Sequence, residues 1–321
     1  RDAALQQAGH GAHEGLGLAV DLGHRAGHEG GQRCLTHRRA QRGRAVGEPE
    51  RAVGPGHAAL EPLPTVEVPK ELDWDMWCGP APLRPFNGGD PRTPTVGAGN
   101  RGIHPRGFRN YLDYANGTLG DWGIHWLDQV LWVTGEKYPK RIFSTGGRPI
   151  AGPAVLSATE QTTDAPDHQL ATYQFDKFSV QWEHRRFANN NTDKGENVGC
   201  YFYGTKGIFH MGWQKGWTFY PSDAKQPTIT EEPKLNAPDS QNIKELFADF
   251  LAAIRSDGKI KPVSDIGEVH LSTNMALLGM ASLKLGRSLE WDGAKEVIVG
   301  DAAANALLRR DYRKGYEYPK A

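Results

Sequence analysis

The stretch Gly120-Asp121-Trp122-Gly123-Ile124-His125-Trp126-Leu127-Asp128 sets two acids and an imidazole at spacings of four and three residues. On an α-helix, at about 100° per residue, Asp121, His125 and Asp128 fall within roughly 60° of one another. Most residues between them are apolar. A polar stripe on an apolar helix must be satisfied inside the protein or face a cleft. The spacing therefore predicts a helix over about 119–135, stopped by Gly135, with a candidate functional site on it.

Length and charge exclude several classes of function. The chain has 321 residues, a formal net charge of +0 and a sequence pI near 7.3. A neutral balance gives no electrostatic reason to expect nucleic acid or an anionic membrane as a partner. We find neither an apolar run of membrane-spanning length nor a signal peptide. Cys34, Cys78 and Cys200 match no metal-binding spacing, and they leave the compartment open between cytoplasm and periplasm.

Residues 1–62 differ in composition from residues 63–321. They contain no Lys, Ile, Phe, Tyr, Trp, Asn, Ser or Met. A glycine-rich segment without aromatic residues can bury little apolar surface against its ordering entropy. Several missing residue types have AT-rich codons. We therefore interpret 1–62 as a low-complexity leader that is either disordered or read out of frame.

The remainder predicts an α+β fold, with strands arranged mainly as hairpins and helices grouped around them, rather than an alternating parallel sheet. Residues 84–109 are rich in Gly, Pro, Arg and Asn, which predicts a long surface loop. Period-2 patterns and turn residues predict the sheet, and a 3.6-residue period predicts two closing helices. The strands are expected over 141–144, 169–175 with 178–184, 198–203 with 208–211, and 217–220, and the helices over 243–254 and 269–285.

One apparent cofactor motif has the wrong context. Gly97-Ala98-Gly99-Asn100-Arg101-Gly102 fits G-x-G-x-x-G, a pattern that binds a dinucleotide where it joins a strand to a helix. Here Pro91, Pro94 and Pro105 surround it, and the preceding residues are too short for a buried parallel strand. We interpret it as a loop, so no cofactor-binding residue is assigned.

The segment Gly120-Asp121-x-Gly123-x-His125-x-x-Asp128 resembles the signature of the glucose–fructose oxidoreductase, inositol dehydrogenase and rhizopine-catabolism (Gfo/Idh/MocA) family. Similar landmarks occur in order from about Pro64 to the C-terminus. They are Leu72-Asp73-Trp74-Asp75-Met76-Trp77-Cys78-Gly79-Pro80-Ala81-Pro82, Thr163-Asp164-Ala165-Pro166-Asp167, Trp182-Glu183-His184-Arg185, Tyr203-Gly204-Thr205-Lys206-Gly207 and Val299-Gly300-Asp301-Ala302-Ala303-Ala304-Asn305.

The resemblance implies an open-faced, mainly antiparallel sheet flanked by helices. This sheet would form the C-terminal substrate and oligomerisation domain of an enzyme whose N-terminal Rossmann domain binds NAD or NADP. In such enzymes the Asp and His of this helix act beside a Lys from a Glu-Lys-Pro motif. This sequence departs from the pattern, because its Glu136-Lys137-Tyr138-Pro139 follows the helix and contains an extra residue. The parent enzyme is expected to use NAD(P), whereas no cofactor site is evident in this chain.

The candidate site residues have both functional and structural interpretations. We expect His125 to be the general acid/base and Asp121 to orient the substrate or the imidazole. Asp128, Arg109, Trp126 and Tyr114 are candidate substrate contacts, although each has an alternative structural role. Two ligand types alone predict no metal site. Tryptophans can stack on sugar faces but more often lie in a core, which applies to Trp122, Trp126, Trp182 and Trp213.

Three functions remain open at this point. The first is hydride transfer to or from a hydroxyl-bearing carbon of a sugar or cyclitol by an NAD(P)-dependent oxidoreductase. The second is glycoside cleavage through transient oxidation by bound NAD, as the resemblance allows. The third is a non-catalytic sheet domain that oligomerises and lacks a cofactor site. The expected partners are a small sugar or polyol and further copies of the chain, bound through the sheet face.

Overall fold

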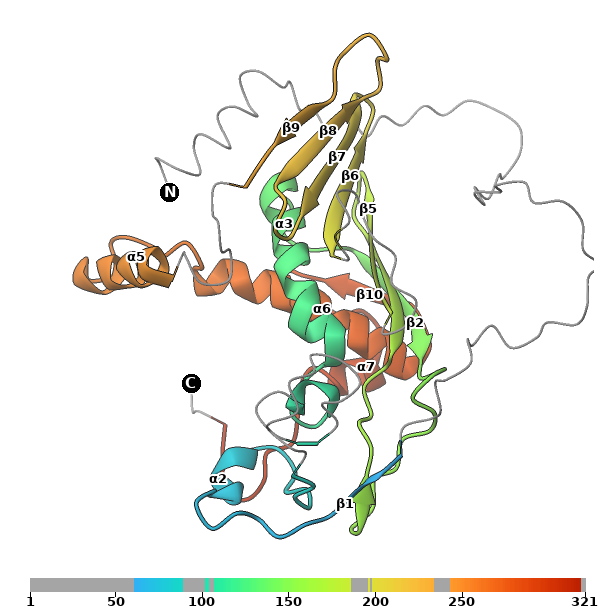
Figure 1. The fold of residues 1–321 in the computed structure, drawn as a ribbon, viewed down its shortest axis with the longest axis vertical. Helices are drawn as coiled ribbons and strands as arrows, with labels where there is room; N and C mark the ends of the chain where they lie inside the picture. The colour runs from blue at the N-terminus through green and yellow to red at the C-terminus, as the bar shows by residue number, and fades with distance from the viewer. Residues whose placement is uncertain are drawn as a thin grey trace, which may run out of the picture.

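A computed structural model describes residues 61–88, 102–103, 107–185, 196, 198–233 and 243–318 (Figure 1). Most of the predicted leader therefore lies outside the described residues, as does the glycine-rich stretch up to Arg101. The fold class is the predicted one, because antiparallel sheets are packed against a small number of helices.

Two antiparallel sheets form the framework. The larger has the strand order β11-β10-β2-β4-β5, and the smaller has the order β6-β7-β8-β9. The predicted hairpins are confirmed, and β9, β10 and β11 are additions that the sequence patterns did not predict. A short third pair joins β1 (Leu63–Pro64) to β3 (Glu160–Gln161). The bounds are β2 (Arg141–Gly147), β4 (His168–Gln174), β5 (Ser179–Arg185), β10 (Leu289–Asp292), β11 (Val297–Ile298), β6 (Gly199–Gly204), β7 (Gly207–Gly212), β8 (Trp217–Pro221) and β9 (Ile229–Glu231).

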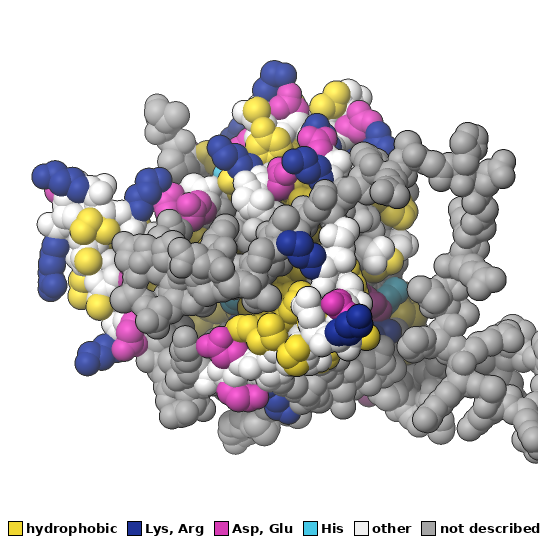
Figure 2. All heavy atoms as spheres, turned by 90° about the horizontal axis from the view of Figure 1, so that it is seen from above, with side chains coloured by type: hydrophobic (Ala, Val, Ile, Leu, Met, Phe, Trp, Pro, Cys, Tyr) yellow, Lys and Arg dark blue, Asp and Glu magenta, His cyan; other side chains and the backbone are white. Residues whose placement is uncertain are grey.

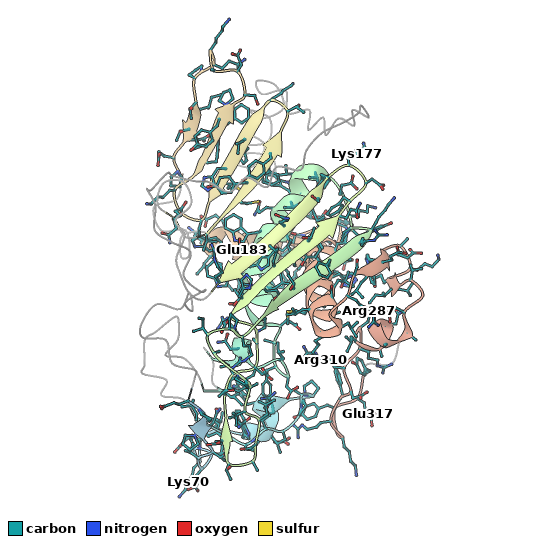
Figure 3. The ribbon with its side chains drawn as sticks, turned by 90° about the vertical axis from the view of Figure 1, so that its right-hand side faces the viewer. Lys70, Lys177, Glu183, Arg287, Arg310 and Glu317 are labelled. Carbon is teal, nitrogen blue, oxygen red and sulfur yellow. The ribbon has the colours of Figure 1, made fainter. Side chains whose placement is uncertain are left out.

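The larger sheet has one covered face and one open face. Ile142 pairs with Tyr173 across β2 and β4, and both side chains are fully buried. Phe143, the next residue of β2, points to the opposite face and is exposed, as is Glu183 on β5. Successive strand residues alternate between faces, so one row is buried and the other is in solvent. Figure 3 views the molecule from the open side, with Glu183 labelled and the helices behind.

The helices differ in detail from the sequence prediction. The predicted helix over 119–135 begins with a π-helical turn, η2 (Leu119–Gly123), and continues as α3 (Ile124–Thr134). Gly135 ends it in the left-handed conformation at φ 71°, as expected. The two later helices are confirmed as α5 (Ile243–Arg255) and α6 (Ile266–Leu285). The short helices α2 (Trp74–Cys78), η1 (Phe108–Asn110) and α7 (Ala302–Ala306) were not predicted.

Helix α6 forms the main core by lying directly on the covered face. Its buried residues are mostly small, which allows the helix to approach the strands closely. At Gly279 a Cβ atom would stand 2.6 Å from the Tyr173 hydroxyl and 2.8 Å from a Leu119 methyl. Near the helix end, the Ser282 hydroxyl accepts a hydrogen bond from the Ser144 backbone N–H at 2.9 Å. The helix is therefore attached to β2, β4 and η2 at once.

A second, smaller core corrects the prediction of a surface loop over 84–109. Among its described residues, Phe86 and Ile103 are buried against Trp74 and Tyr111. The Asn87 side chain accepts a hydrogen bond from the Ile103 N–H at 2.7 Å and donates one to the Tyr111 hydroxyl at 2.8 Å. The composition predicted a polar surface loop. Instead, the buried side chains of Phe86 and Ile103 and the hydrogen-bonded amide of Asn87 hold both ends of the segment in the smaller core.

The C-terminal segment connects the two cores through hydrogen bonds and an ion pair. Arg313 forms an ion pair with Asp75 at 2.5 Å and donates hydrogen bonds to the carbonyl oxygens of Gly79 and Ala81. Arg310 donates to the Asp113 carbonyl oxygen at 2.9 Å. These contacts cross more than 190 residues of sequence, so the chain end holds α2 against the segment before η2.

The close approach at Gly279 gives the first prediction. Gly279→Ala adds helix propensity but forces a methyl group between fully buried Tyr173 and Leu119, so we expect the free energy of unfolding to fall by about 1–3 kcal/mol. Chemical denaturation measures it. Gly267→Ala, in the exposed first turn of the same helix, is the control and should be neutral or stabilising. A Gly279→Ala chain as stable as the parent would contradict the packing.

Candidate functional site

The π-helical turn η2 gives the start of the predicted polar helix an unusual geometry. Its glycines allow close contacts, because a Cβ at Gly123 would lie 2.6 Å from a Leu119 methyl and one at Gly120 would lie 2.7 Å from the Asn116 Cβ. Single π-helical turns at the start of or within α-helices are rare and are frequent at functional sites. Sequence reasoning assumed a continuous α-helix and missed this turn.

Asp121 and Arg109 form an ion pair in front of this turn. The Arg109 Nε donates to the Asp121 Oδ1 at 2.7 Å, and both side chains are partly exposed. Two candidate residues are thus brought together, although no direct hydrogen bond joins Asp121 to His125 among the described contacts. The expectation that Asp121 orients the imidazole therefore has no contact to support it, whereas its orientation of the substrate stays a prediction.

His125 is exposed and lies among tryptophan rings. The imidazole centroid is 6.0 Å from that of Trp122 and 5.7 Å from that of Trp213, each in an edge-on arrangement. Trp213 also lies 5.2 Å from Trp122 and 6.1 Å from Trp126. Trp213 comes from the loop after β7, so the smaller sheet supplies one wall beside the imidazole. Trp182, the fourth tryptophan considered as a sugar contact, instead packs on the main core. Its indole N–H donates a hydrogen bond to His184 Nδ1 at 3.1 Å.

Glu196 holds the loop that carries Trp213. Its carboxylate Oε1 accepts a hydrogen bond from the Gln214 backbone N–H at 2.6 Å. A Cβ at Gly212 would overlap the same carboxylate, so glycine is required there for the carboxylate to enter the loop. Glu196 is buried and was missed by sequence reasoning, since the only signal in the sequence was the pair of glycines, Gly212 and Gly216, around Trp213.

The three other candidate substrate contacts take structural positions. Asp128 Oδ1 accepts a hydrogen bond from the Ser272 hydroxyl of α6 at 2.5 Å. Trp126 is 6% exposed, and its indole N–H has no hydrogen-bond partner among the described residues. The Tyr114 hydroxyl donates to the Pro82 carbonyl oxygen at 2.9 Å, and burial raises the pKa of this phenol. These contacts favour the structural alternative for Asp128 and Tyr114.

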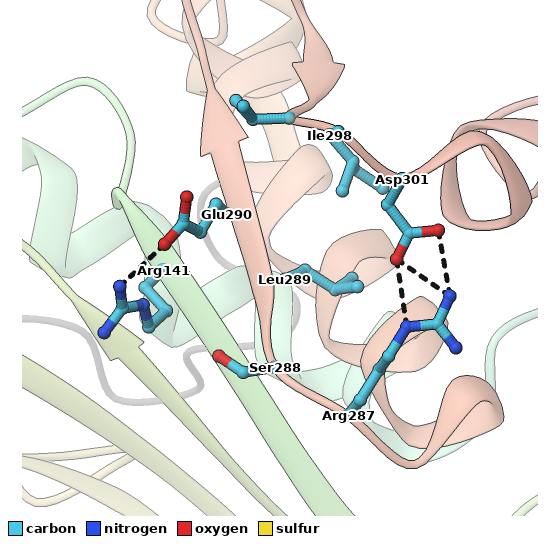
Figure 4. Close-up of a pocket in the computed structure, with 9 residues that line it drawn as sticks. Arg141, Arg287, Ser288, Leu289, Glu290, Ile298 and Asp301 are labelled. Atoms are coloured by element: carbon cyan, nitrogen blue, oxygen red, sulfur yellow. Dashed lines mark hydrogen bonds and ion pairs between the residues drawn. The ribbon is translucent and has the colours of Figure 1, made fainter.

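Two cavities lie elsewhere in the molecule. The larger, about 1070 Å³, opens between α6, the C-terminal segment and the α2 region. The smaller, about 420 Å³, is bordered by two ion pairs, Arg141 with Glu290 and Arg287 with Asp301 (Figure 4). Neither is lined by Asp121 or His125. The candidate site lies outside these two cavities, at the junction of η2, α3 and the Trp213 loop.

The described residues set further limits on the chemistry. No three His, Cys, Asp or Glu side chains in the described ranges are grouped closely enough to hold a metal ion. Of the helices that can be described, none is long and apolar enough to cross a membrane. The side chains described at the candidate site are an imidazole, one carboxylate paired with a guanidinium, and aromatic rings.

Comparison with known proteins identifies the family. The model of an oxidoreductase family's C-terminal α/β domain matches residues 56–143 and 164–318, which is well over half of the chain. The chain belongs to the Gfo/Idh/MocA oxidoreductase family. No match was found among curated protein sequences.

Solved structures of Gfo/Idh/MocA type resemble the chain only distantly. Levoglucosan dehydrogenase, in complex with NADH and L-sorbose, is 17% identical with a TM-score of 0.42, covering 57% of this chain and 52% of that one. An oxidoreductase from Agrobacterium radiobacter, in complex with NAD+, L-tartaric acid and magnesium, is 11% identical with a TM-score of 0.39, covering 55% and 49%. An NAD-binding protein from Listeria innocua is 16% identical with a TM-score of 0.38, covering 57% and 50%. The chain spans about half the length of these proteins.

The Asp128–Ser272 hydrogen bond gives the second prediction. Removing either partner leaves the other without its bond across the α3–α6 interface, so Asp128→Ala and Ser272→Ala should each lower the free energy of unfolding by about 1–2 kcal/mol. The double variant should cost less than the sum, with a coupling of about 1 kcal/mol measured by denaturation. Gln129→Ala is the control on the same helix. Additive effects would show that the two side chains do not interact.

Asp301 gives the third prediction, on pH. Hydrogen bonds from the Ala304 backbone N–H and then from Arg287 lower the pKa of this carboxyl. A carboxyl whose pKa is lower in the folded state than in the unfolded state, where it is about 3.9, stabilises the fold at pH values above 3.9. This stabilisation is lost as the pH falls through the folded-state pKa. Asp301→Asn should therefore melt earlier than the parent at pH 7, and the gap should close below about pH 4. A gap that is constant with pH, or one reproduced by Asp311→Asn, would contradict this role.

Proposed function

We propose that this chain supplies the substrate-binding half of an NAD(P)-dependent oxidoreductase that transfers a hydride to or from a hydroxyl-bearing carbon of a sugar or cyclitol. The observation that carries the proposal is the exposed imidazole of His125, which lies between Trp122 and Trp213. This residue is on α3, the helix that follows the π-helical turn η2. Family membership supports the reaction class, and the site residues support the choice of a hydroxylated ring.

His125 is the proposed general acid/base. A carbinol carbon that loses a hydride becomes a carbonyl only if its hydroxyl proton also leaves, and an imidazole titrates near neutral pH. The side chain is in solvent contact, so it can reach a bound hydroxyl and return the proton to water. In the reverse direction the imidazolium donates the proton to the new alkoxide.

The surroundings of His125 suit a ring with an apolar face and polar edges. Tryptophan faces stack on the C–H surface of sugars and cyclitols. The ion pair of Asp121 with Arg109 offers a carboxylate acceptor and a guanidinium donor to ring hydroxyl groups. Both residues are partly exposed and can contact a ligand without unfolding the turn. We assign these two side chains to substrate orientation.

The described residues do not themselves fit a dinucleotide. Every strand pair in the described part of the chain is antiparallel, whereas the dinucleotide cradle needs a parallel strand, a glycine-rich turn and a helix N-terminus. We therefore assign no residue of this chain to NAD(P) and derive no step through it. The cofactor is proposed for the whole enzyme only.

This observation favours a second candidate function, a non-catalytic domain that binds ligand or other copies of the chain without turnover. Titration of NADH fluorescence separates the two candidates for this polypeptide. Binding at micromolar affinity would refute the second candidate, and absence of binding would support it. A third possibility, NAD-dependent glycoside cleavage, would release free aglycone with no net NADH, whereas the proposed oxidoreductase yields a ketone with net NADH.

The experiment that tests the proposed function is an assay of the whole enzyme, which includes the cofactor-binding domain, with NAD+ or NADP+ and a panel of sugars and cyclitols, followed by absorbance of the reduced nicotinamide. His125→Ala should lower turnover by roughly 10² or more, because the proton acceptor is lost. Val133→Ala, an exposed side chain on the same helix, is the control and should leave turnover unchanged. Unchanged turnover in His125→Ala would remove this residue from the mechanism, and absence of turnover by the whole enzyme with every sugar and cyclitol would refute the proposal.

A further inference from the structure

The motif Thr163-Asp164-Ala165-Pro166-Asp167 contains a buried ion pair that the proposed reaction does not use. The Asp164 Oδ2 accepts a hydrogen bond from Arg84 Nη2 at 2.9 Å, and the two side chains are 11% and 9% exposed. Figure 2 shows many other charged side chains of both signs at the surface of the face in view. A buried ion pair adds little stability, because removing two charges from water costs about as much as their attraction returns. What this pair holds in place is therefore more informative than its own energy.

Asp164 holds the segment that follows Arg109. Its Oδ1 accepts a hydrogen bond from the Leu112 backbone N–H at 2.7 Å. The backbone N–H groups of Asp164 and Ala165 both donate to the Asn110 carbonyl oxygen at 3.0 Å. Three hydrogen bonds from two consecutive residues of the motif therefore fix the backbone one and three positions after Arg109.

Arg84 completes this clamp from the segment's other end. Its Nε donates to the Asp113 Oδ2 at 2.7 Å, so one guanidinium joins a carboxylate of the segment to the Asp164 carboxylate of the motif. The planar set of donors on arginine suits two carboxylates at once. The guanidinium carbon also lies 5.4 Å from the ring centroid of Tyr111, which is fully buried. The backbone over residues 110–113 is thus fixed in position and in direction.

Arg109 depends on this clamp because its own ion pair is weak. The side chains of Arg109 and Asp121 are 40% and 32% exposed. Exposed pairs gain little energy and are screened by salt, so this contact cannot by itself hold a long side chain in one place. The helix that carries Arg109, η1, has three residues and no side-chain cap at its start. The position of the guanidinium therefore follows from how the backbone after it is held.

We propose that Asp164 is a positioning residue of the candidate site, which holds the segment after η1 so that the Arg109 guanidinium stays beside Asp121. The inference rests on the proposed function, because it assigns to Asp164 the placement of the two side chains that orient the substrate. Asp164 acts from the buried side, through Arg84 and the backbone of residues 110–112. Its effect on a bound hydroxylated ring passes through Arg109.

Solvent exchange of the Arg109 Nε–H proton, followed by nuclear magnetic resonance on this chain, tests the clamp without any turnover. In the parent chain this proton lies in the ion pair and should exchange slowly. Asp164→Ala should speed the exchange by roughly tenfold or more, the factor expected for the loss of a hydrogen bond to a charged group. Asp167→Ala is the matched control and should leave the rate unchanged. Asp167 is equally buried in the same motif, but its carboxylate accepts hydrogen bonds from the backbone of residues 150–151.

Asp164→Asn keeps the test valid should the alanine variant not fold. An amide has one acceptor oxygen where the carboxylate has two, so it can serve the Leu112 N–H or the Arg84 guanidinium but not both. The Arg109 proton should again exchange faster than in the parent. Exchange at the parent rate in either folded Asp164 variant, or equal acceleration by Asp167→Ala, would overturn the proposal. Circular dichroism confirms that each variant is folded.

Kinetics of the whole enzyme test whether the clamp serves the reaction. Arg109→Ala and Asp164→Ala should each lower kcat/KM by roughly tenfold. The double variant should be no slower than Arg109→Ala alone, because Asp164 acts through Arg109. Losses that multiply would show a merely structural role and contradict the proposal. An enzyme with no turnover on any sugar or cyclitol, but with the predicted exchange rates, would refute the proposed function and leave the placement of Arg109 by Asp164 standing.

Discussion

The close packing of α6 on the sheet at Gly279 determines where the rest of the molecule lies. The absence of a side chain there lets the helix reach the Tyr173 hydroxyl and the Leu119 methyl groups. Leu119 begins the π-helical turn, so the same contact fixes the start of the helix that carries His125. The packing of a closely approached helix has little freedom to adjust. The position of the candidate site is therefore a consequence of core packing on its far side.

From that anchored turn, the site is completed by contributions from two distant segments. Arg109, ahead of the turn, pairs with Asp121, and the Trp213 loop comes from the smaller sheet. Glu196 holds this loop through the Gln214 N–H and the space at Gly212. The Trp213 loop is positioned by a backbone hydrogen bond and by glycine, and Asp121 is paired with Arg109, while His125 itself stays exposed. A rigid frame around an accessible imidazole suits proton transfer to a bound hydroxyl.

The sequence predicted those elements that depend on residues close together in the chain. Alternation in β4 and β5 around Asp176 and Lys177 predicted the hairpin, because a period of two and a turn signal suffice. The π-helical turn escaped prediction, since it depends on contacts of Gly120 and Gly123 with Asn116 and Leu119. Trp213 was one of four equivalent tryptophans until the tertiary structure placed it beside His125. The pairing of Asp128 with Ser272 is a long-range contact with no local signal, and the only signal for the contact of Glu196 was the pair of glycines around Trp213.

The amphipathic pattern of α5 shows a different limit of prediction. Its 3.6-residue period correctly indicated a helix with one apolar face, but periodicity does not identify what covers that face. The account as a whole depends on Trp213, which follows β7 of the smaller sheet, lying beside His125 of α3. Nuclear Overhauser measurements between the Trp213 indole and His125 imidazole protons test this most directly. With ring centroids 5.7 Å apart, cross-peaks are expected, and they should disappear in Trp213→Leu. Absence of cross-peaks in the parent protein would contradict the site.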